Sequence, residues 1–171
     1  MKFLEKDLEQ IIYDANKELL AEKGLYIRGK LLRQLRVGNY GIADLVEFKR
    51  PYYHPYYKRT IKGEVIVYEL KQDKIGISAF LQALGYLKGI KSFFENKGIE
   101  DNYHYSITLI GKEIDTASTF IYLTDFLQLD ISESDIDSES KFTLLNYLYS
   151  YDIDGIKFNQ IEGYDLLSKG F

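Results

Sequence analysis

Asp44, Glu69 and Lys71 are the residues of this sequence whose types and spacing could do chemistry. Glu69 and Lys71 end the apolar run 65–71, and alternation along a strand would point both side chains to one face. Burying a carboxylate and an ammonium beside an apolar sheet is costly unless they are paired or hold a metal. Asp44 lies between apolar neighbours in a second strand-like run, 42–48. We therefore expect the three side chains to form one site.

The two acids also predict a metal site. Carboxylates at the ends of adjacent strands repel each other unless a cation lies between them, and their oxygens suit Mg²⁺ or Mn²⁺. Such an ion lowers the pKa of its water and neutralises charge that develops on a phosphodiester. Lys71 could orient the attacking water or stabilise the pentavalent phosphorane. Gln82 and Tyr86, which share one face of an expected helix, could hold the same water or phosphate and brace this surface.

Apolar periodicity predicts the elements that must position these residues. Helices are expected at 5–21, 75–96 and 117–127, strands at 31–37, 42–48, 65–71 and 103–110, and a polar loop at 130–141. Residues 144–149 could form a helix or a strand, and residues 156–161 a strand. This order indicates an α/β fold in which helices flank a mixed central β-sheet. We expect one domain over residues 1–171, with a core at about 1–128 and a carboxy-terminal extension at about 129–171.

Composition excludes several classes of protein. With 171 residues, 46% of them hydrophobic and 28% charged, the chain has the composition of a single globular domain. It has no cysteine, which excludes disulfides, thiolate zinc sites and cysteine nucleophiles. The charged start and the lack of an apolar run of about 18 residues predict a cytoplasmic protein with no membrane partner. His54 and His104 lack ligand partners at a recognisable spacing.

Charge is distributed unevenly around a net value of −4. Residues 26–74 carry 11 Lys or Arg and 5 Asp or Glu, whereas residues 100–171 carry 4 and 14. Basic clusters near the expected site could hold phosphates, although solvated faces explain them equally well. Residues 50–59 contain both prolines and four tyrosines and are expected to form an exposed loop. These rings could stack bases, but packing on the protein surface is the interpretation that we favour.

Taken together, these motifs resemble those of a known family. Ala43-Asp44, Tyr68-Glu69-Leu70-Lys71 and Gln82-Ala-Leu-Gly-Tyr86 resemble the PD-(D/E)XK nuclease superfamily, including the Gln-x-x-x-Tyr element of its RecB-like branch. The opening segment Leu4-Glu-Lys-Asp-Leu-Glu9 is similar to the acidic first helix of those domains, particularly the NucS-type nuclease domain. The resemblance covers residues 5–90, and the sequence lacks the proline that often precedes the aspartate.

The resemblance implies a restriction-endonuclease-like core, in which helices flank a four-stranded mixed sheet. The metal ligands that it implies are Asp44, Glu69, the backbone carbonyl of Leu70, and Glu9 or Glu5 of the first helix. The catalytic set that it implies is Asp44, Glu69, Lys71, Gln82, Tyr86 and Glu9. Glu5 and Glu9 lie one turn apart on one face and could serve the metal directly or through water, and we favour Glu9.

The sequence therefore predicts a Mg²⁺- or Mn²⁺-dependent DNA nuclease that hydrolyses phosphodiester bonds with metal-activated water. DNA is the expected partner. The sequence does not decide the oligomeric state, and a homodimer is one option because dimers are common among similar nucleases. The alternative is a catalytically inactive nuclease-fold module that binds nucleic acid or protein in a defence or repair complex. In a third interpretation, the acidic second half forms a protein-interaction surface.

Overall fold

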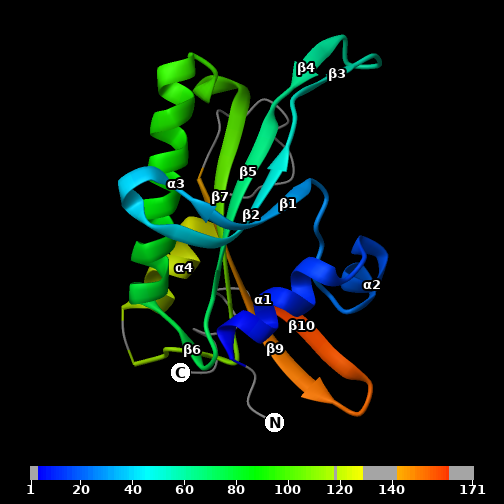
Figure 1. Ribbon diagram of the computed structural model, residues 1–171, viewed down its shortest axis with the longest axis vertical. Helices are drawn as coiled ribbons and strands as arrows, with labels where there is room; N and C mark the ends of the chain where they lie inside the picture. Colours follow the sequence, from blue (N-terminus) through cyan, green and yellow to red (C-terminus); the bar gives the residue numbers. More distant parts are fainter. Residues whose placement is uncertain (1–3, 118, 129–141, 162–171) are drawn as a thin grey trace.

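A six-stranded mixed sheet with helices on both faces organises the chain (Figure 1). The computed structural model describes residues 4–117, 119–128 and 142–161. The helices are α1 (Glu5–Asp14), α2 (Lys17–Glu22), α3 (Ile77–Lys97) and α4 (Phe120–Gln128), with 3-10 turns η1 (Gly38–Tyr40) and η2 (Glu100–Asn102). The strands are β1 (Lys30–Arg36), β2 (Ile42–Lys49), β3 (Tyr52–His54), β4 (Arg59–Ile61), β5 (Gly63–Leu70), β6 (Lys74–Ile75), β7 (Tyr103–Gly111), β8 (Glu113–Ile114), β9 (Thr143–Asp152) and β10 (Gly155–Ile161).

The strand order in the main sheet is β1-β2-β5-β7-β9-β10. The pairs β5–β7 and β7–β9 are parallel, whereas β1–β2, β2–β5 and β9–β10 are antiparallel hairpins. The expectation of an α/β fold with a mixed central sheet and flanking helices is confirmed. The sheet has six strands where the resemblance implied four, because the stretch expected as a carboxy-terminal extension supplies β9, which pairs with β7, and β10, which pairs with β9.

Two apolar layers cover the two faces of the sheet. Along β5, Val65 and Val67 pack in the cluster formed with α3 and α4, whereas Tyr68 and Leu70 pack in the cluster formed with α1 and α2. A strand buried on both faces must be apolar almost throughout, which explains the continuous run that ends at Glu69. A carboxylate in that position is therefore held inside a covered sheet.

The first predicted helix is two helices in the structure. The chain is extended at Ala15 and Asn16, where ψ is 144° and 157°, and it re-enters a helix at Lys17. The Asn16 side chain accepts a hydrogen bond of 2.7 Å from the Leu19 N–H and so caps α2. The prediction of one helix over 5–21 was wrong because the apolar spacing continues across a break that this local hydrogen bond stabilises.

Residues 50–62 form an arm that continues the β2–β5 hairpin beyond the sheet (Figure 1). Its strands β3 and β4 pair antiparallel, with Tyr52 opposite Ile61, in the same register that places Lys49 opposite Glu64. The exclusion of residues 50–59 from the central sheet is confirmed, but the stretch is a hairpin and not a loop. The tyrosines are exposed on this arm, which does not agree with the favoured packing of their rings on the protein surface.

The other predicted elements keep their type, with small shifts at their ends. Helix α3 ends at Lys97 and is followed by Gly98 in the left-handed conformation, with φ of 65°. Residues 144–149 lie in strand β9, which decides between the two options left open. The loop expected at 130–141 lies outside the described residues. Across the described ranges, none of the helices is long and apolar enough to cross a membrane.

Gly41→Ala tests how the β1–β2 turn is built against α3. Gly41 has φ of 113°, and an added Cβ would lie 3.0 Å from Cε1 of the Tyr86 ring. We expect the substitution to lower the free energy of unfolding by about 1–2 kcal/mol, because the backbone is strained and the ring must move.

The matched control is Gly85→Ala inside α3, where an added Cβ meets nothing within 4 Å. Its expected effect is neutral or stabilising by up to about 1 kcal/mol. Urea unfolding of both variants checks the pair. Equal stability of the two variants would show that the turn does not depend on glycine.

Candidate active site

Asp44 and Glu69 meet on neighbouring strands at one end of the sheet. The pairing of Leu45 with Tyr68 is the last of the β2–β5 ladder, and Asp44 and Glu69 are the next residues of the two strands. The two carboxyl groups are close enough for the Asp44 charge to raise the pKa of Glu69. The Asp44 Oδ2 atom also accepts a hydrogen bond of 3.1 Å from the Leu70 N–H, which fixes this carboxylate against the end of β5.

The Glu69 carboxylate is buried and only half satisfied. The residue is 1% exposed, and its Oε1 accepts a hydrogen bond of 2.7 Å from the Lys71 ammonium. Its Oε2 is buried without a hydrogen-bond partner in the described part of the chain. Because nearly all buried polar atoms have a partner, an oxygen of this kind indicates a place for water or an ion.

Lys71 links the acids to helix α3 through a chain of polar contacts. Its Nζ lies 3.4 Å from Oε1 of Gln82, and the Gln82 Nε2 donates a hydrogen bond of 2.9 Å to the Tyr86 hydroxyl. Tyr86 is buried with its ring against Gly41. The structure thus brings together Asp44, Glu69, Lys71, Gln82 and Tyr86, the five predicted residues of the strands and α3.

Hydrogen bonds to residues of three other strands, β7, β8 and β9, hold the segment that carries Lys71. The Lys71 N–H donates to the Ile110 carbonyl at 2.8 Å, which extends the parallel pairing of β5 with β7. The Tyr149 hydroxyl of β9 donates to the Gln72 carbonyl at 2.6 Å. The Asp73 carbonyl accepts from the N–H groups of Lys112 and Glu113 at 2.8 and 3.0 Å. These bonds fix the backbone from which the ammonium projects.

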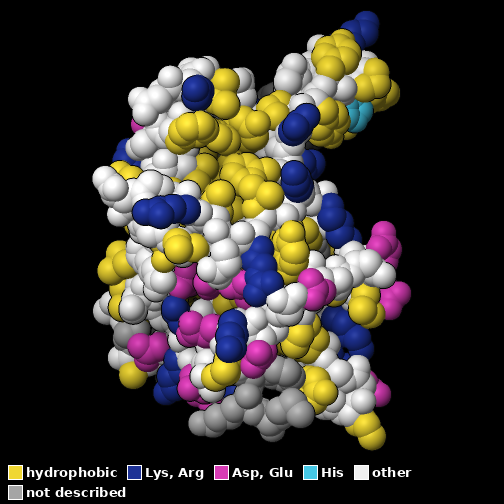
Figure 2. Space-filling model, viewed as in Figure 1, with side chains coloured by type: hydrophobic (Ala, Val, Ile, Leu, Met, Phe, Trp, Pro, Cys, Tyr) yellow, Lys and Arg dark blue, Asp and Glu magenta, His cyan; other side chains and the backbone are white. Residues whose placement is uncertain are grey.

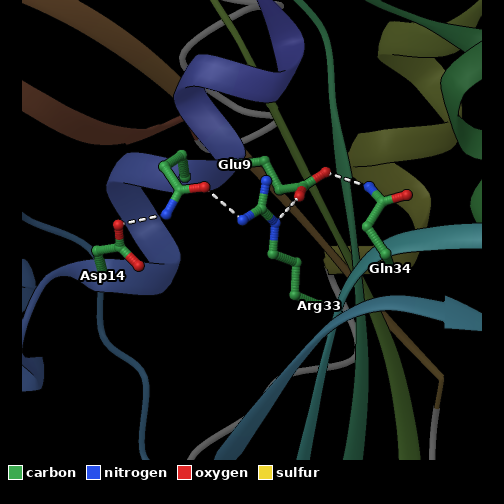
Figure 3. A network of polar contacts seen from close by, with 5 residues as sticks. Glu9, Asp14, Arg33 and Gln34 are labelled. Atoms are coloured by element: carbon green, nitrogen blue, oxygen red, sulfur yellow. Dashed lines mark hydrogen bonds and ion pairs between the residues drawn. The ribbon is translucent and has the colours of Figure 1, made fainter.

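Helix α1 brings Glu9 to the adjacent strand β1 (Figure 3). Glu9 is buried, and its two carboxylate oxygens accept from Arg33 and from Gln34. Gln34 lies in β1 between the residues paired with Leu45 and Ala43, so it is opposite Asp44, and its φ is 51°. Left-handed backbone inside a strand is costly for a residue other than glycine and gathers at functional sites.

Arg33 and Gln34 are the site residues that the sequence analysis missed. The only signal for them is a pair of polar residues in the middle of the strand, between Leu32 and Leu35. They hold the carboxylate of Glu9 that the resemblance implied for the metal, so a metal bound by Glu9 would share its oxygens with these two hydrogen bonds. Glu5 is exposed one turn earlier, and its charge acts on both Asp44 and Glu69. The metal-binding roles of Glu5 and Glu9 stay predictions.

Burial raises the pKa of both acids. Burial raises the pKa of Glu69 to about 7, the Lys71 hydrogen bond opposes this rise, and the Asp44 charge adds to it. Burial also raises the pKa of Asp44, against the lowering effect of the Leu70 N–H. For Lys71, burial lowers the pKa, but the hydrogen bond and charge of Glu69 outweigh it, so the net pKa is raised. A cation between the acids would relieve their repulsion.

The described residues offer a metal ion two carboxylates and further oxygens. Within these ranges, no three Asp, Glu or His side chains converge closely enough to hold an ion by themselves. Asp44 and Glu69 would therefore be joined by water and by the Leu70 carbonyl. This donor set fits Mg²⁺, which usually keeps several waters and takes only one or two carboxylates.

Comparisons with known proteins do not identify a relative. No family profile, no curated protein and no solved structure matches the chain. The function must therefore be argued from the geometry of the site.

Glu69→Gln should change how stability depends on pH when no divalent ion is present. Between the usual glutamate pKa of 4.5 and about 7, the folded protein binds more protons at Glu69 than the unfolded chain. The free energy of unfolding should therefore fall as pH rises across this window, by roughly 1–3 kcal/mol, and then stay level. The glutamine side chain of the variant cannot titrate, so the variant should lose this decline.

Urea unfolding in EDTA from about pH 4.5 to pH 8 measures this dependence. Glu95→Gln on the exposed face of α3 is the matched control and should keep the decline of the wild type. A decline of the same size in Glu69→Gln would mean that another group is responsible.

Proposed function

We propose that the protein is a metal-dependent DNA nuclease of the PD-(D/E)XK type. The observation that carries the proposal is the buried, unpartnered Oε2 of Glu69 in the described part of the chain, which lies near Asp44 and beside the Lys71 ammonium. An acid pair with raised pKa values and a fixed cation is the arrangement that metal-assisted hydrolysis of a phosphodiester needs. DNA is the proposed substrate and Mg²⁺ or Mn²⁺ the proposed cofactor.

The order and placement of the elements support a restriction-endonuclease-like core as part of this proposal. Helix α1 precedes the three strands β1, β2 and β5, and α3 then connects β5 to the parallel strand β7. Helices α1 and α3 pack in the clusters on opposite faces of the sheet. These are the elements that the resemblance requires on either side of the Glu-x-Lys strand.

The residues present fit a small divalent ion. Asp44, Glu69 and the Leu70 carbonyl would hold it, with Glu5 or Glu9 completing the shell from α1. When bound, such an ion supplies an activated water and neutralises charge on the phosphate. The raised pKa values of Asp44 and Glu69 support this assignment, because burial and repulsion penalise the two negative charges in the protein alone.

Lys71 acts as a fixed positive charge in this proposal. Its raised pKa keeps the ammonium protonated at neutral pH, which disfavours a role as general base. An ammonium held beside Glu69 stabilises negative charge on a phosphate oxygen in the transition state. Gln82 orients the ammonium, and Tyr86 orients Gln82 in turn, so these two residues position Lys71.

The charge pattern between the arm and the β1–β2 side of the sheet supports a polyanionic substrate. Figure 2 shows Lys and Arg side chains spread over one face of the molecule. They lie between the arm and the acidic side chains near the middle of this face. An open groove along the β1–β2 edge is lined by Lys17, Arg28, Gly29, Lys30, Leu31, Leu32, Phe48, Lys49 and Arg50. Five of these lining residues are cationic and none is acidic. Clustered Lys and Arg of this kind attract phosphates.

Lys71→Ala and Asp44→Asn should each lower the rate of DNA cleavage by about 10²–10³-fold, because each removes charge from the reacting centre. The assay follows plasmid and single-stranded DNA with Mg²⁺ or Mn²⁺ over time. Lys74→Ala is the matched control, since Lys74 is an exposed lysine three residues further along the chain and should keep full activity. Equal rates in the wild type, Lys71→Ala and Asp44→Asn would remove the assignment.

Glu69→Gln should abolish tight uptake of Mn²⁺, since it removes one of the two carboxylates. Titration calorimetry at about pH 8, above the raised pKa of Glu69, measures binding without any turnover. Glu64→Gln on the same strand is the matched control and should bind Mn²⁺ like the wild type. A module that kept this fold without a metal site would show no uptake that depends on Asp44 or Glu69.

A further inference from the structure

The arm of residues 50–62 carries exposed aromatic rings that the proposed chemistry does not use. Tyr56 is 82% exposed and Tyr53 is 61% exposed, while Tyr52 and Tyr57 are about half exposed. Figure 1 shows β3 and β4 extending away from the sheet, and Figure 2 shows apolar side chains along this arm with Lys or Arg at its end. Exposed rings at this density need a reason, because a folded chain usually buries them.

The rings on the arm are ordered by contacts with one another. The His54 ring lies 6.1 Å from Tyr52 and 4.6 Å from Tyr57, and Tyr57 lies 5.1 Å from Tyr56 in an edge-on arrangement. The Arg59 guanidinium lies 5.8 Å from the centre of the Tyr57 ring. These distances describe a row of rings next to cations, held in place before any ligand arrives.

The charge on the arm has one sign. Residues 50–62 contain four Lys or Arg residues and no Asp or Glu. The basic groove along the β1–β2 edge reaches the root of the arm at Lys49 and Arg50. A ligand that fits this surface carries regularly spaced negative charge together with flat faces that can stack on the rings.

Single-stranded nucleic acid has both properties. Its phosphates pair with cations, and its unpaired bases expose faces that stack on aromatic side chains whatever their sequence. A duplex buries those faces between base pairs, and an acidic polypeptide offers charge with few rings. The combination of rings and cations therefore favours an unpaired strand over both.

We propose that the arm is a stacking platform for a single-stranded segment of the substrate. This inference rests on the proposed nuclease function, because it assumes that the single-stranded DNA runs from the arm to Asp44 and Glu69. The root of the arm at Gly63 and the acid at Glu69 are on one strand, roughly 20 Å apart at about 3.3 Å per residue. At about 3.4 Å per stacked nucleotide, about six nucleotides span this distance.

The experiment measures DNA binding without cleavage. Fluorescence anisotropy in EDTA follows a labelled single strand of about 20 nucleotides, longer than one such binding site, and the matching duplex. The double variant Tyr56→Ala/Tyr57→Ala should weaken binding of the single strand at least about tenfold, because two rings no longer stack on bases, and should leave duplex binding unchanged. Tyr56→Phe/Tyr57→Phe keeps the rings and should bind like the wild type. Tyr122→Ala, at an exposed tyrosine of α4, controls for a general loss of surface aromatics.

Salt titration separates stacking from charge. The Tyr→Ala double variant should keep the salt dependence of the wild type, since its cations still neutralise the same phosphates. Lys58→Gln/Lys62→Gln should lower the slope of log K against log salt by about 0.7 for each phosphate that is no longer neutralised. Circular dichroism and urea unfolding confirm that every variant is folded.

Three results would overturn the proposal. They are unchanged single-strand binding by Tyr56→Ala/Tyr57→Ala, equal losses for single strand and duplex, and displacement of the single strand by poly-glutamate as readily as by unlabelled DNA. These outcomes do not depend on catalysis. If binding depends on the arm but the wild type cleaves no DNA, the proposed nuclease function is contradicted and the role of the arm is not. If the wild type cleaves DNA but the arm variants bind the single strand as the wild type does, only the proposed role of the arm is contradicted.

Discussion

The cost of burying the Glu69 carboxylate is the constraint on which the rest of the site depends. The carboxylate lies inside a sheet covered on both faces, with Asp44 nearby and one oxygen unpartnered among the described residues. A single hydrogen bond from Lys71 compensates only part of its desolvation, so the pKa of Glu69 stays raised. Such an arrangement destabilises the protein alone, and the proposed cation would relieve part of this cost, as expected where function competes with stability.

The strand pairing of the sheet fixes where the groups around this buried carboxylate lie. Antiparallel pairing of β2 and β5 sets the two acids side by side, and parallel pairing of β5 and β7 fixes the backbone at Lys71. The same β2–β5 hairpin continues in one register into the arm, so the acids and the exposed rings lie on one continuous element. One hairpin thus relates the proposed reacting centre to the proposed strand-binding surface.

The sequence predicted what depends on periodicity and on residue type. Alternation placed Glu69 and Lys71 together, and helical spacing placed Gln82 beside Tyr86, because these patterns are local. It missed the break at Ala15–Asn16, which a side-chain cap stabilises while the apolar spacing continues. It also missed the contacts of Arg33 and Gln34 with Glu9, since they join segments far apart in the sequence. The sequence predicts a loop at residues 50–59 and not a hairpin, because the prolines and tyrosines there show no alternation of apolar and polar residues.

A crystal structure of the wild-type protein soaked in Mn²⁺ at about pH 8, above the raised pKa of Glu69, tests the central claim most directly. The account predicts an anomalous peak between the carboxylates of Asp44 and Glu69, with oxygen ligands at about 2.0–2.6 Å. It also predicts that Oε2 of Glu69, unpartnered within the described ranges of the protein alone, is one of these ligands. No peak at this position at saturating Mn²⁺, with Glu69 bound only to Lys71, would contradict it.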